Sequence, residues 1–315
     1  MKSIFDVLLT ILPFEKPNYF DAAQIPCHYV GHPAVEHMLE LFDNTHAHNP
    51  EQVQAESPEE ILSALRASVL SRRQDSQRLY ATAASTETLE RGRASDMIVL
   101  VCPGSRLQEV KRSLPLQLEA IKKFQSNCQI RHISVVVQTF PAETTKVGHY
   151  VKQFLNNIKP PKTGSLRVFL ETNDTGKRNS FAAADLAIAT SGTVVTELAL
   201  VSVPTVVVYP GDKITAWLAK QIANVSFVSI PNIMANKELV REVLFEQCFA
   251  EACAQALADA NAFSQQSELD VVLKQLISVN KVRGRPQLPS EVAADVLLRL
   301  AKERGDVPPA AALLT

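Results

Sequence analysis

Between residues 97 and 250 the chain alternates short, continuous runs of Val, Ile and Leu with longer stretches of helical pattern. A strand that is apolar at every position needs cover on both faces, which is typical of a parallel sheet packed between helices. The alternation therefore predicts a doubly wound, Rossmann-type α/β sheet. The runs expected to form its strands are 97–102, 133–137, 167–171, 185–190, 204–209 and 225–230.

Ligands of such sheets bind at the carboxyl ends of the strands, in the turns that lead into the helices. Three turns of this chain carry polar groups at that position, after Cys102, after Thr190 and after Ile230. We therefore expect the functional residues in these three turns.

The first turn, "CPGSRLQEV", contains Gly104, Ser105 and Arg106 before a basic helix. Glycine permits a tight turn, serine can cap a helix, and a helix N-terminus offers N–H groups with partial positive charge. Arg106 adds a planar cation that suits phosphate oxygens. The residues alone are equally consistent with an anion site and with an ordinary turn whose arginine pairs with Glu109.

The second turn, "ATSGTVVTELAL", places Ser191, Gly192 and Thr193 at the start of a helix and Glu197 one turn further on. Hydroxyls and N–H groups at the helix start suit a phosphate, and a carboxylate one turn away suits the two hydroxyls of a ribose. Together they indicate a nucleotide. The alternative is a helix cap in which Glu197 only favours the helix dipole.

The third turn, "SIPNIMANKELV", offers Asn232, which could bind a sugar or phosphate or could simply be a turn residue. Neither of the first two turns matches a Walker loop or the dinucleotide pattern G-x-G-x-x-G, so the sequence disfavours ATP hydrolysis and NAD chemistry.

Composition limits the remaining classes. The chain has 315 residues, 46% of them hydrophobic, and a formal net charge of -1, which indicates a globular protein that does not bind nucleic acid. No apolar run reaches the roughly 18 residues of a membrane span, so any membrane contact is expected to be peripheral. The five cysteines include no C-x-x-C pair and favour reduced thiols in a cytosol-like compartment. The histidines fit no standard ligand spacing, and no metal site is expected.

We expect four regions along the chain. Residues 1–45 contain two strand-like runs without the units that would complete their sheet, so they are interpreted as the remnant of an otherwise missing domain. Residues 46–96 are polar and are predicted to be a linker or insertion with one helix, "SPEEILSALRASVLSRR". Residues 97–250 form the Rossmann-like domain, and 251–315 are predicted to be C-terminal helices with a frayed tail.

Five separated blocks, taken in order, carry a family resemblance. They are "ILPFEKPNYFDAAQIPCHYVGHP", "PGSRLQEVKRSLP", "ATSGTVVTELALVSVPTVVVY", "TAWLAKQI" and "VSIPNIMANKELVREVLFEQC". The chain resembles the lipid-A-disaccharide synthases, which are glycosyltransferases of the GT-B type with two Rossmann-like domains. The resemblance covers residues 5–37 and about 97–250.

The resemblance implies transfer of diacylglucosamine from UDP-2,3-diacylglucosamine to 2,3-diacylglucosamine 1-phosphate, with release of UDP and without a cofactor or metal. Residues 1–45 would then be the remnant of the N-terminal acceptor domain, and 97–250 the UDP-sugar-binding domain. It implies catalytic roles for Arg106 and Asn232. The implied substrate-binding set is Gly104, Ser105, Arg106, Ser191, Gly192, Thr193, Glu197 and Asn232.

The resemblance also implies a cytoplasmic protein peripheral to the inner membrane, or an organellar protein in a eukaryote. A second copy of the chain or a complementary N-terminal half is the expected protein partner. Two alternatives stay open. The chain could be a truncated, non-catalytic UDP-sugar-binding half or subunit, or it could be another GT-B enzyme that uses a UDP-sugar.

Overall fold

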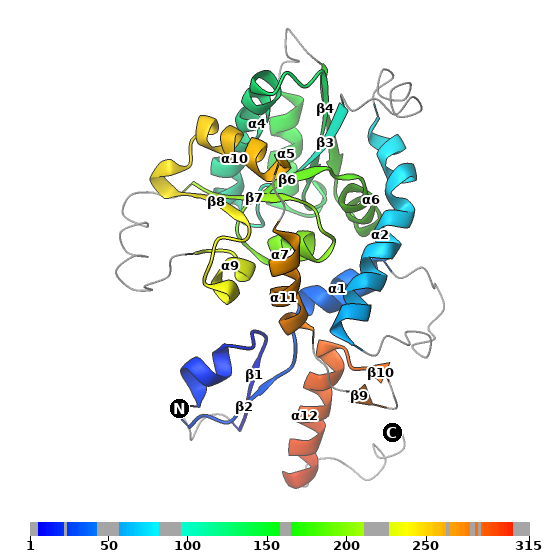
Figure 1. Ribbon diagram of the computed structural model, residues 1–315, viewed down its shortest axis with the longest axis vertical. Helices are drawn as coiled ribbons and strands as arrows, with labels where there is room; N and C mark the ends of the chain where they lie inside the picture. Colours follow the sequence, from blue (N-terminus) through cyan, green and yellow to red (C-terminus); the bar gives the residue numbers. More distant parts are fainter. Residues whose placement is uncertain are drawn as a thin grey trace. The chain divides into compact units, whose positions relative to one another are not determined.

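The computed structural model describes residues 6–21, 24–42, 57–81, 96–157, 165–210, 227–262, 265–277, 281–282 and 285–304. The chain divides into two compact units. One consists of residues 1–64 and 273–315, and the other of residues 65–272. Figure 1 labels the helices and strands.

The larger unit is built on a six-stranded parallel sheet in the order β5-β4-β3-β6-β7-β8. Three strands lie on each side of the junction between β3 and β6 and follow one another outward from it, which is the strand order of a doubly wound dinucleotide-binding fold. The predicted α/β class is therefore confirmed. The strands are β3 (Asp96–Cys102), β4 (His132–Gln138), β5 (Ser165–Glu171), β6 (Leu186–Ala189), β7 (Thr205–Tyr209) and β8 (Arg241–Leu244).

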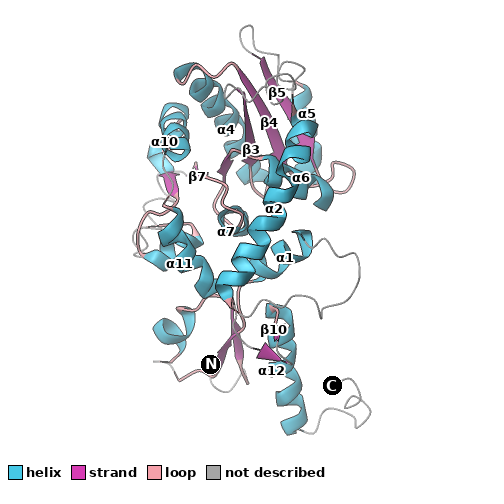
Figure 2. Cartoon of the chain, turned by 45° about the vertical axis from the view of Figure 1, so that its right-hand side comes forward, coloured by secondary structure: helices cyan, strands magenta, loops and turns pink. Residues whose placement is uncertain are grey.

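Helices cover both faces of this sheet (Figure 2). The helices α4 (Leu107–Asn127), α5 (Lys146–Asn156) and α10 (Ala250–Ala262) bury their apolar side chains against one face. The helices α6 (Asp174–Ala183) and α7 (Thr193–Leu200) pack against strands on the other face. Cover on both faces explains why the central strands are apolar at nearly every position.

Five of the six predicted strand runs are strands, and the sixth prediction is wrong. In the described part of 225–230, Val228 and Ser229 bond by their N–H groups to the Glu242 side chain, at 3.0 and 2.9 Å, in place of a neighbouring strand. Pro231 then lies in the first turn of the short helix α9 (Ile230–Ala235), where its missing N–H costs nothing. The sixth strand is β8, a half-exposed edge strand.

The prediction of a polar linker over 46–96 also needs correction, because helix α2 occupies Pro58–Tyr80. The helix expected within this linker is longer than predicted, and from residue 65 onward α2 belongs to the larger unit. Arg66 makes a bidentate ion pair with Asp270, at 2.6 and 2.9 Å. Arg73 pairs with Asp185 at 2.6 Å, next to β6. The charged side chains of α2 therefore bind it to other parts of the larger unit. In the sequence, the same residues are typical of a solvated linker.

The boundary predicted between residues 250 and 251 is not a structural one. Helix α10 begins at that point and packs on α4 and β7, and most of α11 (Gln266–Leu276) also belongs to the larger unit. The C-terminal helix α12 (Pro289–Arg304) instead belongs to the smaller unit.

The smaller unit brings together two distant parts of the chain. The strands β1 (Leu8–Thr10) and β2 (Cys27–Tyr29) pair in parallel, and a short π-helix, η1 (Lys16–Phe20), lies between them. The helix α1 (Pro33–Phe42) packs on α12, and the Ser290 N–H donates to Glu36 at 3.0 Å. A two-stranded antiparallel ladder joins β9 (Lys281–Val282) and β10 (Arg285–Pro286).

Candidate functional site

The turn after β3 has the tight geometry that its sequence predicts. Gly104 has a φ of +113°, and a Cβ at this position would clash with a carboxylate oxygen of Glu109. That oxygen accepts the Ser105 N–H at 3.1 Å and lies 3.5 Å from the Arg106 nitrogen. Glu109, which sequence reasoning considered only as a partner for the Arg106 side chain, therefore binds the backbone N–H groups where an external anion was expected. Arg106 is exposed at the N-cap of α4.

The turn after β6 leaves its hydroxyl and backbone groups more open. Gly192 and Thr193 are exposed at the start of α7, and a Cβ on Gly192 would meet no atom within 4 Å. The backbone of Gly192 is extended, so the conformation does not require glycine. Ser191 donates its hydroxyl to the Val228 carbonyl at 2.6 Å. The second turn is thus tied to the chain that follows β7 and has space in front of it.

Glu197 is buried in an ion pair. Its carboxylate lies 2.9 Å from the Lys177 ammonium, and the two side chains are 7% and 16% exposed. Lys177 comes from α6 and also lies over the Phe181 ring. The pair is close enough to affect Cys102 at the end of β3. Burial, with a smaller contribution from the Glu197 charge and against the Lys177 charge, raises the pKa of the Cys102 thiol to about 12.

Asn232 uses its whole carboxamide on the protein itself. Its Nδ2 donates to the Val240 carbonyl at 2.7 Å and to Glu242 at 2.8 Å. Its Oδ1 accepts the N–H groups of Leu239 and Val240, both at 2.8 Å. Two donors and two acceptor positions are the full capacity of an asparagine side chain. The expected direct contact of Asn232 with a sugar therefore gives way to a structural role in closing the 232–240 loop.

The sheet brings the first two turns together. β3 and β6 are neighbours in which Cys102 lies opposite Ala189, and the Thr190 N–H donates to the Cys102 carbonyl at 3.0 Å. This junction is where the strand order reverses, and in open α/β sheets it forms the ligand-binding crevice. The segment before the third turn is connected to the second turn, because the Ser191 hydroxyl donates to the Val228 carbonyl.

Two participating residues were missed from the sequence. Lys177 lies in a polar stretch without a motif, and Glu242 lies in a charged edge strand. Lys177 is in α6, which follows β5, and its partner Glu197 is in α7, which follows β6, so only the folded sheet brings these two together. Glu242 binds residues of the segment between β7 and its own strand, β8.

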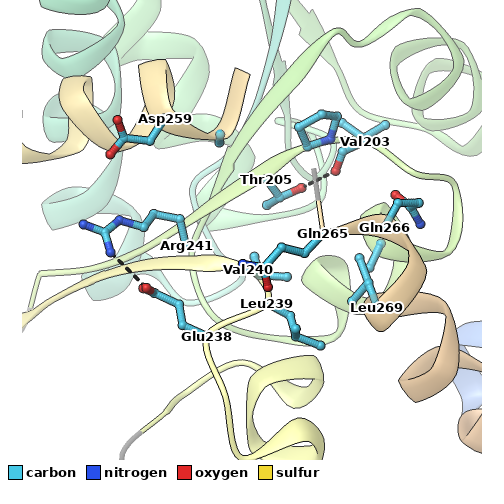
Figure 3. Close-up of a pocket in the computed structure, with 13 residues that line it drawn as sticks. Val203, Thr205, Glu238, Leu239, Val240, Arg241, Asp259, Gln265, Gln266 and Leu269 are labelled. Atoms are coloured by element: carbon cyan, nitrogen blue, oxygen red, sulfur yellow. Dashed lines mark hydrogen bonds and ion pairs between the residues drawn. The ribbon is translucent and has the colours of Figure 1, made fainter. Parts of the chain in front are cut away.

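A cavity of about 150 Å³ lies at the amino ends of strands β7 and β8 (Figure 3). Thr205 and Arg241, the first residues of β7 and β8, line it together with Gln265. Arg241 pairs with Glu238 at 2.9 Å there. Because all six strands are parallel, this cavity is separate from the turns at their carboxyl ends.

The predictions about metals and membranes concern features that the structure describes only in part. Within the described ranges, no group of three or more His, Cys, Asp or Glu residues is arranged to hold a metal ion. His32 is buried, and its Nδ1 accepts the Ala34 N–H at 3.1 Å. His46 and His48 lie outside the described residues. None of the helices in the described part of the chain combines the length and apolar content needed to cross a bilayer.

The order of its sheet and the helices on both faces define the larger unit as a Rossmann-like α/β domain. A family model described as lipid-A-disaccharide synthetase matches residues 1–90 and 75–295. The chain therefore belongs to the lipid-A-disaccharide synthase family.

Individual relatives agree with this assignment. The lipid-A-disaccharide synthase of Nitrobacter winogradskyi is 29% identical over 304 residues, which are 96% of this chain and 63% of that protein. The synthase of Rhodospirillum centenum is 30% identical over 304 residues, covering 95% of this chain and 61% of the relative. The chain thus spans a little over three fifths of the length of these curated relatives.

Solved structures give a more distant likeness. A UDP-GlcNAc 2-epimerase from Methanocaldococcus jannaschii, in complex with UDP-GlcNAc and UDP, has a TM-score of 0.47 and 12% identity, covering 95% of this chain and 62% of that one. An α,α-trehalose 6-phosphate synthase from Burkholderia multivorans has a TM-score of 0.43 and 11% identity, covering 96% and 60%. Neither likeness is close enough to assign a ligand.

Proposed function

We propose that the chain binds a UDP-sugar at the junction of β3 and β6 and serves lipid A biosynthesis as a lipid-A-disaccharide synthase. The observation that carries the proposal is the family match over most of the chain. The adjacency of two polar turns at the strand-order reversal supports it, since this is where the fold class places nucleotides.

In this proposal the two turns share the diphosphate. Because Glu109 already holds the N–H groups of Ser105 and Arg106, phosphate binding at the first turn falls to the Arg106 guanidinium. At the second turn the exposed start of α7, with Gly192 and Thr193, receives the other phosphate oxygens. Gly104 and Ser105 then act by shaping the first turn, and Asn232 acts by fixing its loop.

Glu197 would accept the ribose hydroxyls. With 7% of its side chain exposed, it lies in a largely desolvated position, where a hydrogen bond is stronger than in water. Lys177 holds the carboxylate in place, so its charge is balanced before the nucleotide arrives.

The proposed reaction transfers diacylglucosamine from UDP-2,3-diacylglucosamine to 2,3-diacylglucosamine 1-phosphate and releases UDP. Negative charge develops on the leaving diphosphate, and in this proposal Arg106 and the N-terminus of α7 stabilise it. Both sugars carry acyl chains, so the site must meet its substrates at a membrane surface. We therefore place the protein at the cytoplasmic face of the inner membrane as a peripheral protein.

Calorimetric titration with UDP tests the binding site. Arg106→Ala should weaken UDP binding by about 1.5–3 kcal/mol, the range for a hydrogen bond to a charged group. Arg131→Ala is the matched control, because this exposed arginine precedes β4 and lies at the amino ends of the strands, away from the turns at their carboxyl ends. Equal losses in both variants would exclude a specific role for Arg106.

Two further measurements separate ribose recognition and turnover. Glu197→Gln should weaken UDP more than it weakens a deoxy-UDP that lacks the ribose hydroxyls, and equal weakening would return Glu197 to a purely structural role. Release of UDP from the two acylated substrates tests catalysis directly. Binding of UDP without turnover would support the alternative of a non-catalytic UDP-sugar-binding subunit.

A further inference from the structure

Glu242 is the centre of a hydrogen-bond network that ends at the candidate site. One carboxylate oxygen accepts the Ser229 N–H at 2.9 Å, the Ser229 hydroxyl at 2.6 Å and the Asn232 Nδ2 at 2.8 Å. The other accepts the Val228 N–H at 3.0 Å. Four donors therefore converge on a single carboxylate of the edge strand β8.

The network determines where Val228 lies. Its N–H is held by Glu242, and its carbonyl accepts the Ser191 hydroxyl at 2.6 Å. Ser191 lies two residues before Thr193, the first residue of α7, in the turn proposed to hold the diphosphate. One residue thus separates the Glu242 carboxylate from the side chain that anchors this turn.

Ordinary strand packing does not explain a carboxylate at position 242. An ion that accepts four N–H and O–H groups is a stronger acceptor than a neutral amide. A glutamine here would direct its own NH2 group at groups that are themselves donors, and at least one of them would lose its partner. The site is therefore specific for a carboxylate.

Resting on the proposed function, we propose that Glu242 is a positioning residue for the UDP-sugar site. It fixes Val228, the Val228 carbonyl fixes the Ser191 hydroxyl, and Ser191 holds the start of α7 in the conformation that binds the diphosphate. Glu242 itself does not touch the ligand. Its contribution to affinity passes through Ser191, which gives the proposal a distinctive consequence.

The test is a double-mutant cycle on UDP affinity, measured by calorimetry on the full chain. Glu242→Gln should weaken UDP binding about tenfold, as expected when one hydrogen bond to a charged group is lost. In a Ser191→Ala background the hydrogen bond from residue 191 to the Val228 carbonyl is already absent, so the same substitution should weaken UDP binding less than about threefold. Equal losses in both backgrounds would overturn the proposal, because a general loss of stability acts independently of Ser191.

Two further variants keep the test decisive. Glu246→Gln changes an exposed glutamate four positions along the chain and should leave UDP affinity unchanged. If Glu242→Gln does not fold, Ser229→Ala replaces it in the cycle, because it removes only one of the four donors to Glu242. Ser229→Ala should weaken UDP binding less than Glu242→Gln does, and its effect should again be smaller in the Ser191→Ala background.

The outcomes separate this proposal from the one on which it rests. Absence of UDP binding by the unsubstituted chain would overturn the proposed function and the role of Glu242 with it. UDP binding that persists unchanged in Glu242→Gln would overturn the positioning role alone.

Discussion

The ion pair between Lys177 and Glu197 should be the most sensitive interaction of the candidate site. The ammonium and the carboxylate lie 2.9 Å apart, with 16% and 7% of the side chains exposed. At an effective dielectric constant of about 20, two charges at this distance attract by about 6 kcal/mol. Desolvation of both groups offsets much of that attraction, so the net value of the pair is far smaller than the cost of removing one partner.

Lys177→Met keeps a side chain that can pack on Phe181 but leaves the Glu197 carboxylate buried without its cation. We expect it to lower the free energy of unfolding by about 3 kcal/mol, the lower end for a broken buried pair, because Lys177 retains some exposure. In the double variant Lys177→Met with Glu197→Gln, the loss of unfolding free energy should be about 2 kcal/mol smaller than the sum of the losses in the two single variants.

Urea denaturation followed by circular dichroism measures all three variants. Lys152→Met is the matched control, because Lys152 pairs with Glu143 at 3.4 Å on the surface, where both side chains are more than half exposed. Its unfolding midpoint should stay close to that of the unsubstituted chain. A coupling energy below about 0.5 kcal/mol between Lys177 and Glu197 would refute the reasoning, since independent sites give additive losses of that accuracy.

Two other predictions concern the turn after β3. Burial raises the pKa of Cys102 to about 12, so above pH 9 the unfolded chain loses this proton before the folded chain does, and stability falls by up to about 1.4 kcal/mol per pH unit. Urea titrations in reductant should therefore show a shallower loss of stability between pH 9 and 11 for Cys102→Ala, and an unchanged slope would contradict the raised pKa. Gly104→Ala should cost about 1–3 kcal/mol, because it forces a side chain into a positive φ and against Glu109. Gly192→Ala, at an extended and open position, should cost much less in the same denaturation experiment, and similar losses would refute the steric argument.

The sequence predicted the part of the fold that depends on burial. Strands covered on both faces have to be apolar throughout, so β3, β4 and β7 stand out as continuous runs. Strand β8 escaped prediction because it has only four residues, of which Arg241 is exposed and only Val243 is buried. Such a short strand has no continuous apolar run.

Helix α2 could not be recognised as part of the larger unit for a related reason. It docks through long polar side chains, among them Arg66, Arg73 and Gln77, whose partners are carboxylates and backbone carbonyls. The identity of those partners depends on the tertiary structure, and in the sequence the same residues are typical of a solvated segment. The apolar stems of such side chains can still cover a sheet.

The candidate site was predictable in position but only partly in its contacts. The rule that ligands bind after the carboxyl ends of the strands selected the turns that contain Gly104 and Ser191, and the sheet places them side by side. Glu109 was predicted only as a possible partner of the Arg106 side chain, and Lys177 and Glu242 belong to no motif in the sequence. Their roles come from distances that exist only after folding.

The third turn shows why residue type alone does not assign a role. An asparagine after an apolar run is equally consistent with a sugar contact and with a turn residue, and the folded chain saturates Asn232 with the N–H groups of Leu239 and Val240, the Val240 carbonyl and Glu242. The same Glu242 carboxylate also accepts the Val228 N–H, and the Val228 carbonyl accepts the Ser191 hydroxyl. A substitution at Asn232 would therefore affect the proposed UDP site indirectly, by changing the loop that Asn232 closes. Loss of function at this position would be compatible with a residue that never touches the ligand.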